Sequence, residues 1–363
     1  PGGVISGQLQ YGDGGGGNLN GCAPFAPASL TGLVVLVDRG ACNFTLKIKN
    51  VGDAGGVVGI IGLVAPGAPF SGGDGGDAPI TIPGYMISQA DSNALKGLLG
   101  STATLDPANQ LPLIGQMVGS SSRGPSNFYQ QIKPEIGAPG ASVSAIAGSG
   151  TGTGPFGGTS GAAPMVSGSA ALLLSGFGTN QKSGGGGNAN GLALSPAETK
   201  ALLMNNADTN IDIDPFSGLA EITRIGGGEV RANWAMAAPA AAWDANAPQA
   251  ALSFGMHEVD GVTTVTRTVQ VHNYSNEWQT YTITPTFRNA GDATGAVVPA
   301  APASVTLNPG LGNDSFFDVT LTIDGSLLPG NFMNSGSQGA NGAALSANEF
   351  DGYLVLDNGN CLL

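Results

Sequence analysis

The most pronounced shortages in this 363-residue chain are of charge and of histidine. Charged residues make up 10% of the sequence, with 12 basic residues against 25 acidic residues and 2 histidines. Ordinary soluble domains carry about 25% charged residues. The resulting formal net charge of -13 argues against nucleic acid and against an anionic membrane as partners, because both bind clustered positive charge.

Long apolar runs are also missing. A membrane helix needs about 18 consecutive apolar residues, and the longest candidate run here is interrupted at Gly59, Gly62 and Gly67. We therefore expect no membrane span in this portion. No signal peptide is visible at Pro1, so we expect such a segment to have been removed or to lie upstream.

Cysteine is scarce, with three residues in the chain. Cys22 and Cys42 flank the apolar run 33–37, and a disulfide between them would close a modest loop in an oxidising compartment. Cys361 is left over, either as a free thiol or as a partner for a group outside the chain.

Glycine is abundant, at 61 residues, and 41% of the chain is hydrophobic. Apolar runs alternate with turn signals throughout, which favours a folded, loop-rich and β-heavy protein over a disordered one. The length suffices for two or three domains, each with its own core.

One segment carries the signature of a nucleophile. Gly158–Gly168 reads Gly-Thr-Ser-Gly-Ala-Ala-Pro-Met-Val-Ser-Gly, and it places Ser160 at the start of a helix. Free backbone amides at Thr159 and Ser160 would favour a developing oxyanion. The apolar stretch Ala162–Leu174 predicts a helix buried on all sides that ends near Gly176. The alternative interpretation is an ordinary capped helix start, since Thr and Ser are favoured there.

Pro164 belongs to the same segment. We expect it in or just after the first helical turn, where a missing amide costs little.

These residues resemble the serine motif of the subtilisin-like proteases (subtilases, peptidase family S8), with Ser160 at the nucleophile position. Further segments resemble the family in the same order, with Glu135 where Asp is usual. Two of these segments, 121–126 and 133–140, precede the serine. Two follow it: the expected helix 195–204 with the adjoining residues 205–208, and the turn and strand at 225–233. Ser195 is the expected N-cap of that helix and Pro196 its first residue.

The first third of the chain resembles a protease-associated (PA) domain. The resemblance rests on 21–24, 33–44, 47–61 and 80–88, which are expected to form buried strands, a short amphipathic helix and turns, with a further helix at 91–99. Such domains act as lids or binding modules and carry no chemistry. Asp38 therefore belongs to this domain and not to a catalytic centre.

The last third shows the alternation of half-buried antiparallel strands at 264–273 and 316–323. It follows a linker-like stretch at 235–250 and resembles a fibronectin-III-like sandwich. We thus expect a multi-domain α/β plus β fold: a PA domain (α+β) at 1–116, the nucleophile-bearing C-terminal part of a subtilisin-like α/β catalytic domain at 117–243, and a β-sandwich at 244–363.

The catalytic set is incomplete. A serine needs a base to take its proton and a carboxylate to orient that base. The two histidines, His257 and His272, both lie in the expected sandwich, and we interpret them as structural or surface residues. The resemblance implies that the catalytic Asp and His and the oxyanion Asn precede the inserted domain, upstream of Pro1 or on a companion segment of the same precursor. The chain alone is expected to be inactive.

The chemistry requires no cofactor. For a structural calcium, Asp74 and Asp77 form one group of candidate oxygen ligands, although loop solvation is the commoner role of such residues. A second group of acidic residues could likewise bind calcium or serve only to solvate a loop. It comprises Asp208, Asp212 and Asp214. The metal, if any, is unknown.

Two functions follow as hypotheses. The first is an extracellular or cell-surface serine endopeptidase that hydrolyses protein or peptide substrates through Ser160. The second is a non-catalytic structural or interaction protein, a repurposed or processed subtilase fragment in an extracellular assembly. The high glycine content, the low charge and the missing base motivate this alternative.

Overall fold

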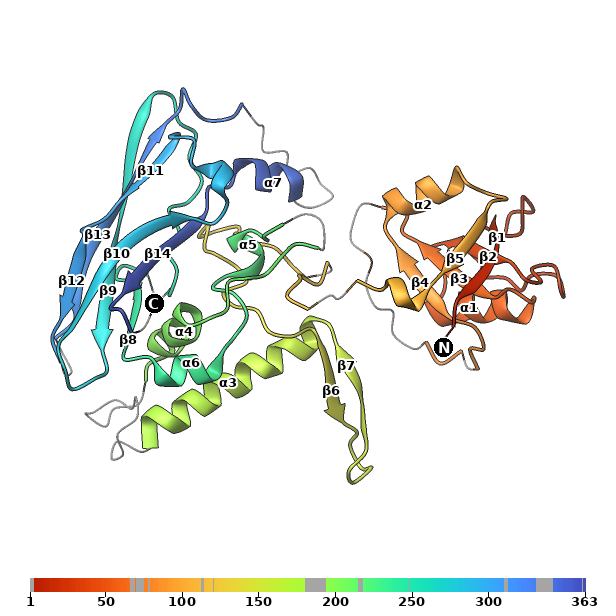
Figure 1. Ribbon diagram of the computed structural model, residues 1–363, viewed down its shortest axis with the longest axis horizontal. Coiled ribbons are helices and arrows are strands. Elements are labelled where there is room, and N and C mark those ends of the chain that lie inside the picture. The colour runs from red at the N-terminus through yellow and green to blue at the C-terminus, as the bar shows by residue number, and fades with distance from the viewer. Residues whose placement is uncertain are drawn as a thin grey trace. The chain divides into compact units, whose positions relative to one another are not determined.

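A computed structural model describes residues 3–65, 69, 75–77, 79–111, 114–119, 121–179, 194–214, 218–247, 249–309, 313–330, 342–360 and 362–363. The chain divides into two compact units (Figure 1). The first unit comprises Pro1–Ile114 with Val118–Ser120, and the second comprises Gly115–Met117 with Ser121–Leu363. None of the described helices has the length and apolarity needed to span a bilayer.

The first unit is built on one five-stranded sheet with the strand order β4-β3-β2-β1-β5. Four strands run parallel and the edge strand β5 runs antiparallel to β1. The elements of this unit are β1 (Ile5–Tyr11), β2 (Val34–Asp38), α1 (Phe44–Asp53), β3 (Val58–Gly62), β4 (Gly84–Ile87), α2 (Gln89–Lys96), β5 (Thr102–Leu105) and a 3₁₀ turn (Pro107–Asn109).

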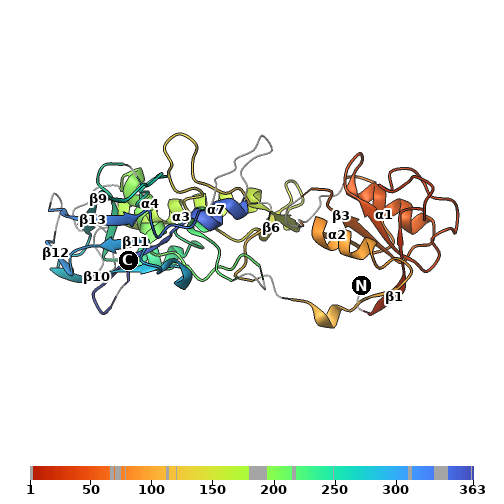
Figure 2. The ribbon, with the colours of Figure 1, turned by 90° about the horizontal axis from the view of Figure 1, so that it is seen from above.

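Both faces of this sheet are covered, which explains the continuous apolar run in β2. Successive side chains of a strand point to opposite faces, so Val35 and Val37 pack with Ile48 of α1, whereas Val34 and Leu36 join a second cluster. Figures 1 and 2 show β3 between α1 and α2. The buried strand predicted at 33–37 is thus confirmed at Val34–Asp38, and Asp38 lies in this unit.

A disulfide joins Cys22 to Cys42, as expected from the sequence. Beside it lies Lys47, a fully buried residue whose ammonium donates to the carbonyls of Asn20 at 2.5 Å and Gly40 at 2.7 Å and contacts Cys22 Sγ at 3.3 Å. Burial lowers the pKa of Lys47. The ammonium and the disulfide together fix the two loops on either side of β2.

We predict that the double change of Cys22 and Cys42 to Ser lowers the free energy of unfolding of the first unit by about 3 kcal/mol, the chain-entropy value for a loop of this size. Serine keeps a hydrogen-bond acceptor near Lys47, so the loss isolates the crosslink. Hydrogen exchange of the β2 and β3 amides measures it. Unchanged protection of those amides in the double variant would show that the crosslink contributes no stability.

The second unit begins with a helical layer around a core of small and aromatic side chains. Its elements before the β-rich part are the hairpin β6 (Ala141–Ala145) and β7 (Thr153–Gly157) and the helices α3 (Thr159–Thr179), α4 (Pro196–Asn205), α5 (Ile222–Ile225) and α6 (Ala232–Ala237). The expected cap of α4 is confirmed, because Ser195 accepts from the Glu198 amide and Glu198 accepts from the Ser195 amide.

The stretch 235–250 is not a linker, contrary to our expectation. It contains the end of α6 and the strand β8 (Ala240–Asp244), which pairs with β9. The side chains of Ala235, Ala238 and Ala241 are almost fully buried against α3 and α4. Alanine serves here as a core residue that lets the helices and the strand approach closely, so its abundance does not indicate an unpacked chain.

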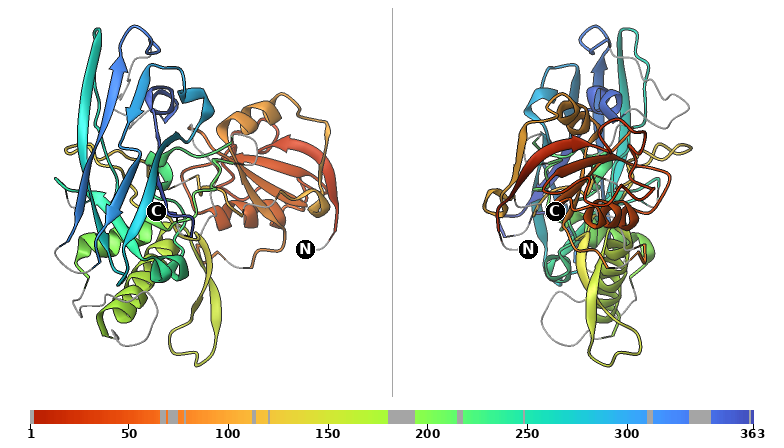
Figure 3. Two further views of the ribbon diagram at one scale, coloured as in Figure 1. Left: turned by 60° about the vertical axis from the view of Figure 1, so that its left-hand side comes forward. Right: turned by 90° about the vertical axis from the view of Figure 1, so that its right-hand side faces the viewer.

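The remainder of the second unit consists of two antiparallel sheets that enclose a common core (Figure 3). One has the strand order β12-β10-β14 and the other β11-β13-β9-β8. Their further strands are β9 (Val262–Asn273), β10 (Gln279–Phe287), β11 (Val297–Ala300), β12 (Ser304–Leu307), β13 (Ser315–Asp324) and β14 (Gly352–Asp357), and α7 (Gly342–Asn348) precedes β14. The two alternating segments predicted as strands are β9 and β13, which pair with each other.

Arg288 joins the sandwich to the helical layer. Its guanidinium, 8% exposed, donates to the carbonyls of Ala220, Thr209 at 2.8 Å and Ile211 at 2.9 Å, and to the hydroxyl of Tyr353 at 2.6 Å. Because a planar guanidinium offers five donors in a fixed geometry, this one side chain satisfies three backbone carbonyls at once.

A partly buried acidic group lies at the same junction. Asp351 accepts from the Ile222 amide at 2.5 Å, and Glu349 accepts from the Thr223 hydroxyl at 2.6 Å and from Arg123 at 2.7 Å. Burial, aided by the neighbouring carboxylates of Glu349 and Asp292 and opposed by the Ile222 hydrogen bond, raises the pKa of Asp351 to about 6. The second carboxylate oxygen of Asp351 is buried without a hydrogen-bond partner among the described residues.

This raised pKa predicts that stability falls with pH. The folded protein keeps the proton up to about pH 6, whereas the unfolded chain releases it at about pH 4. The free energy of unfolding therefore decreases as pH rises between those values and stays lowered above them. Asp351→Asn should remove this loss, because an amide still accepts from Ile222 and donates toward the acidic neighbours.

Urea unfolding followed by tryptophan fluorescence measures this effect, since Trp234, Trp243 and Trp278 all lie in the second unit. At pH 7.5 we expect Asp351→Asn to be more stable than the parent by on the order of 2 kcal/mol, with a smaller difference at pH 4. The exposed Asp260→Asn serves as the charge-matched control. A variant less stable than the parent at pH 7.5 would contradict this account.

Candidate active site

Ser160 lies on a tight turn between a strand and a helix. Strand β7 ends at Gly157, Gly158 adopts a φ of +70°, and α3 begins at Thr159. A left-handed φ favours glycine, so a glycine at 158 lets the chain reverse directly into the helix. The Gly158 amide donates to the Gly140 carbonyl at 2.6 Å, which holds the turn against the segment 133–140. The Ser160 side chain is exposed.

The N-terminus of α3 presents backbone donors around this serine. The amides of Gly161 and Ala162 donate to the Gly158 carbonyl at 3.0 and 3.2 Å. The amides of Thr159 and Ser160 precede the first intrahelical bonds, as in any helix start. These two donors and the helix dipole make the position suitable for a negatively charged oxygen.

The burial of α3 differs from our expectation. Leu173 and Phe177 are buried against α4 and α6, but Leu172 is 59% exposed and Leu174 41% exposed. The helix is therefore buried on one face only, although its sequence is apolar on all faces. The amino-acid composition of α3 did not predict how many elements pack against the helix. It also did not predict where the helix ends, which is at Thr179.

Pro164 lies just after the first turn of α3, at the sixth position of the helix, as expected, but its missing amide does cost a hydrogen bond. A residue there would ordinarily donate its amide to the carbonyl four positions earlier, which belongs to Ser160. The proline ring has no amide proton, so the carbonyl of the candidate nucleophile, Ser160, lacks this intrahelical hydrogen bond.

The segments with family resemblance lie side by side. In 133–140, the Gly137 amide donates to the Gly228 carbonyl at 2.8 Å, and the Gly227 amide donates to the Glu135 carbonyl at 2.9 Å. A Cβ at Gly226 would lie 2.1 Å from the Glu135 carbonyl oxygen, so this approach requires glycine. Burial opposes ionisation of Glu135, but hydrogen bonds from Lys200 and Lys133 outweigh it and lower the pKa of Glu135.

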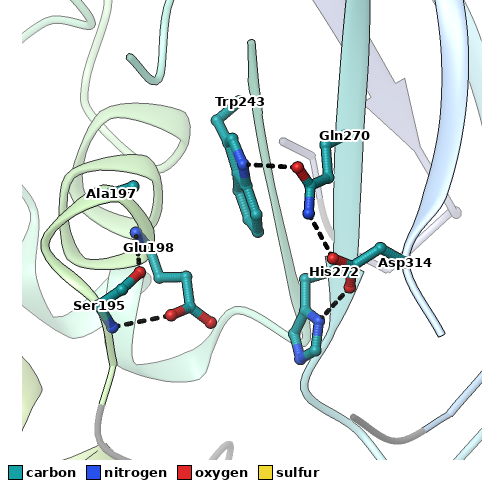
Figure 4. Close-up of a pocket in the computed structure, with 7 residues that line it drawn as sticks. All are labelled: Ser195, Ala197, Glu198, Trp243, Gln270, His272 and Asp314. Atoms are coloured by element: carbon teal, nitrogen blue, oxygen red, sulfur yellow. Dashed lines mark hydrogen bonds and ion pairs between the residues drawn. The ribbon is translucent and has the colours of Figure 1, made fainter. Parts of the chain in front are cut away.

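Neither histidine accompanies Ser160. The Nε2 atom of His257 lies 2.7 Å from the Phe254 carbonyl oxygen. His272 lies on β9, and its Nδ1 is 2.6 Å from Asp314. A pocket surrounds His272 (Figure 4), and its lining does not include Ser160: Ser195, Ala197, Glu198, Trp243, Gln270, His272 and Asp314.

The pair formed by His272 and Asp314 was missed from the sequence. The partners stand 42 residues apart, so no local pattern connects them. The one available signal is the alternation of β9, which places Gln270 and His272 on the same face. Both side chains donate to the same carboxylate, that of Asp314.

Two of the acidic residues considered for calcium, Asp77 and Asp208, have other partners. Asp77 accepts from Thr45 at 2.8 Å and Asn43 at 3.3 Å, while Asp74 lies outside the described residues, as does Cys361. Asp208 pairs with Arg231 at 2.9 Å. Within the described ranges no three His, Cys, Asp or Glu side chains are placed to hold a metal ion.

Comparison with known proteins identifies two families. The model of the subtilase family matches residues 70–275, and that of the PA domain matches residues 5–95. No curated protein matches the chain. Among solved structures, a FixG-related protein from Vibrio parahaemolyticus is 16% identical and covers 20% of this chain and 75% of its own length. The TM-score of this match is 0.14.

The subtilase match covers more than half of the chain and contains the Ser160 turn, the segment 133–140 and the α4 helix. The structure combines α/β and β architecture in several sheets, in keeping with both families. The chain belongs to the subtilase family of serine peptidases and carries a PA domain.

Proposed function

We propose that this chain is the nucleophile-bearing part of a secreted subtilisin-like endopeptidase and that Ser160 attacks the peptide carbonyl. The proposal is supported by the exposed Ser160 at the N-terminus of α3, on a turn whose left-handed backbone at position 158 favours glycine. The proposed reaction needs no cofactor, because a serine, a base and hydrogen-bond donors suffice for acyl transfer.

In this proposal the Ser160 oxygen bonds to the carbonyl carbon of the substrate while its proton passes to a histidine. The amides of Thr159 and Ser160 donate to the resulting oxyanion. The histidine returns the proton to the departing amine, and water then releases the acyl group from Ser160. The histidine, the aspartate that orients it and the oxyanion asparagine are proposed to come from a companion segment of the same precursor, upstream of Pro1 or on a separate chain.

Exposed apolar side chains on α3 and on the β6–β7 hairpin support a companion segment. Leu172 and Leu174 on α3 are exposed, and so are Val143 of β6, Ile146 in the turn after it and Phe156 of β7. Soluble proteins rarely leave apolar surface of this kind uncovered. We propose that the segment carrying the base covers these side chains, so that its binding both buries them and completes the active site.

Several finer features belong to the same proposal. The disulfide Cys22–Cys42 fits secretion, because such bonds persist in oxidising compartments. The PA domain is proposed to act as a lid or binding module for protein substrates. The sandwich is proposed to be fibronectin-III-like, and a structural calcium would be incidental to catalysis.

Ser160→Ala tests the nucleophile in the longer gene product that includes the upstream segment. We expect hydrolysis of a denatured protein substrate to fall by at least about 10³-fold. Ser326→Ala is the matched control, because Ser326 is exposed in the same unit after β13 and its hydroxyl donates to the Asp324 carboxylate at 2.6 Å. This control should keep the parent rate.

Two outcomes would contradict the proposal. One is cleavage by Ser160→Ala at the parent rate, which would place the nucleophile elsewhere. The other is a folded longer product that cleaves no protein substrate and whose α3 face binds a second copy, which would favour the alternative of a structural subtilase fragment.

A further inference from the structure

The pocket around His272 lies within the second unit, between the start of α4 and the strand β9, and has a volume of about 330 Å³. This volume is at the lower end of the range of small-molecule sites. Glu198 and His272 face the same space in Figure 4, and the Trp243 indole stands beside them. Ser160 does not line this pocket, so the peptide hydrolysis proposed for Ser160 gives the pocket no role.

Glu198 brings a negative charge that no cationic side chain among the described residues balances. Its carboxylate accepts from the Ser195 amide at 2.8 Å and from the Tyr274 hydroxyl at 3.2 Å. Burial and the nearby Glu198 raise the pKa of Tyr274, so this hydroxyl stays a donor. Within the described part of the chain, no basic side chain pairs with Glu198 or lines the pocket.

His272 supplies a nitrogen acceptor at the pocket wall. The residue is 5% exposed, and its Nδ1 proton is directed to Asp314, which can only accept when ionised. Hydrogen bonds from His272 and Gln270 lower the pKa of Asp314. In its neutral form the ring carries a lone pair on Nε2, and Nε2 has no hydrogen-bond partner among the described residues.

We propose that this pocket binds a primary ammonium group. The ammonium would donate to the Glu198 carboxylate and to Nε2 of His272, and the attached alkyl chain would lie along Trp243, which also attracts cations through its ring face. A metal ion fits less well, because the described residues offer no group of three ligands. The ammonium belongs either to a small free amine or to a lysine side chain of a protein.

The two probes are n-butylammonium and Nα-acetyl-lysine methylamide, with n-butanol as the uncharged control. Two histidines in the chain make ¹⁵N spectra of the imidazoles simple to assign. At pH 8 we expect saturable shifts of the His272 Nε2 signal with both ammonium probes, no shift with n-butanol, and no shift of His257. A lysine derivative that binds at least tenfold tighter than butylammonium assigns the site to a protein ligand, and the reverse order assigns it to a free amine.

Glu198→Gln removes the charge and keeps the helix start, because glutamine also completes this capping arrangement. We expect affinity for the ammonium probes to fall at least tenfold in this variant, at an unchanged thermal midpoint. The exposed Glu277→Gln is the charge-matched control and should bind as the parent does. The proposal is overturned by an unshifted His272 signal with both ammonium probes, by equal binding of n-butanol, or by parent-like affinity in Glu198→Gln.

Discussion

Helix α3 has apolar side chains around its whole circumference, and only one face of it is packed. The packed face holds the second unit together: Leu173 and Phe177 meet α4 and α6, and the Phe177 ring lies 5.5 Å from the ring of Tyr274, which directly follows β9. Burial of such side chains is worth about 2 kcal/mol each. The turn that holds Ser160 is thus anchored from one side, while the exposed side leaves room for the segment that we propose completes the site.

Much of the fold could be predicted from sequence because its signals are local. The apolar run of β2, the alternation in β9 and β13 and the Ser195 cap each depend on neighbours within a few residues, and the structure contains all of them. The Ser160 turn was equally local, since a glycine and a helix start adjoin in the chain.

The remainder depends on partners far apart in the chain. Arg288 reaches carbonyls more than sixty residues away, and His272 meets Asp314 across 42 residues. An apolar composition likewise does not show how many elements pack around a helix. We expected α3 to be buried on all sides because its side chains are apolar on all sides. The alanines of 235–250 were misinterpreted as a linker for the same reason, because their burial depends on α3 and α4.

Ser160 is proposed to be a nucleophile whose base lies outside this chain. Treatment with a fluorophosphonate probe, followed by peptide mapping, tests it on the chain alone and on the longer product with its upstream segment. We predict labelling of Ser160 in the longer product and none in the chain alone. Equal labelling of Ser160 in both would contradict the need for a companion, and labelling of another serine would contradict the assignment of the nucleophile.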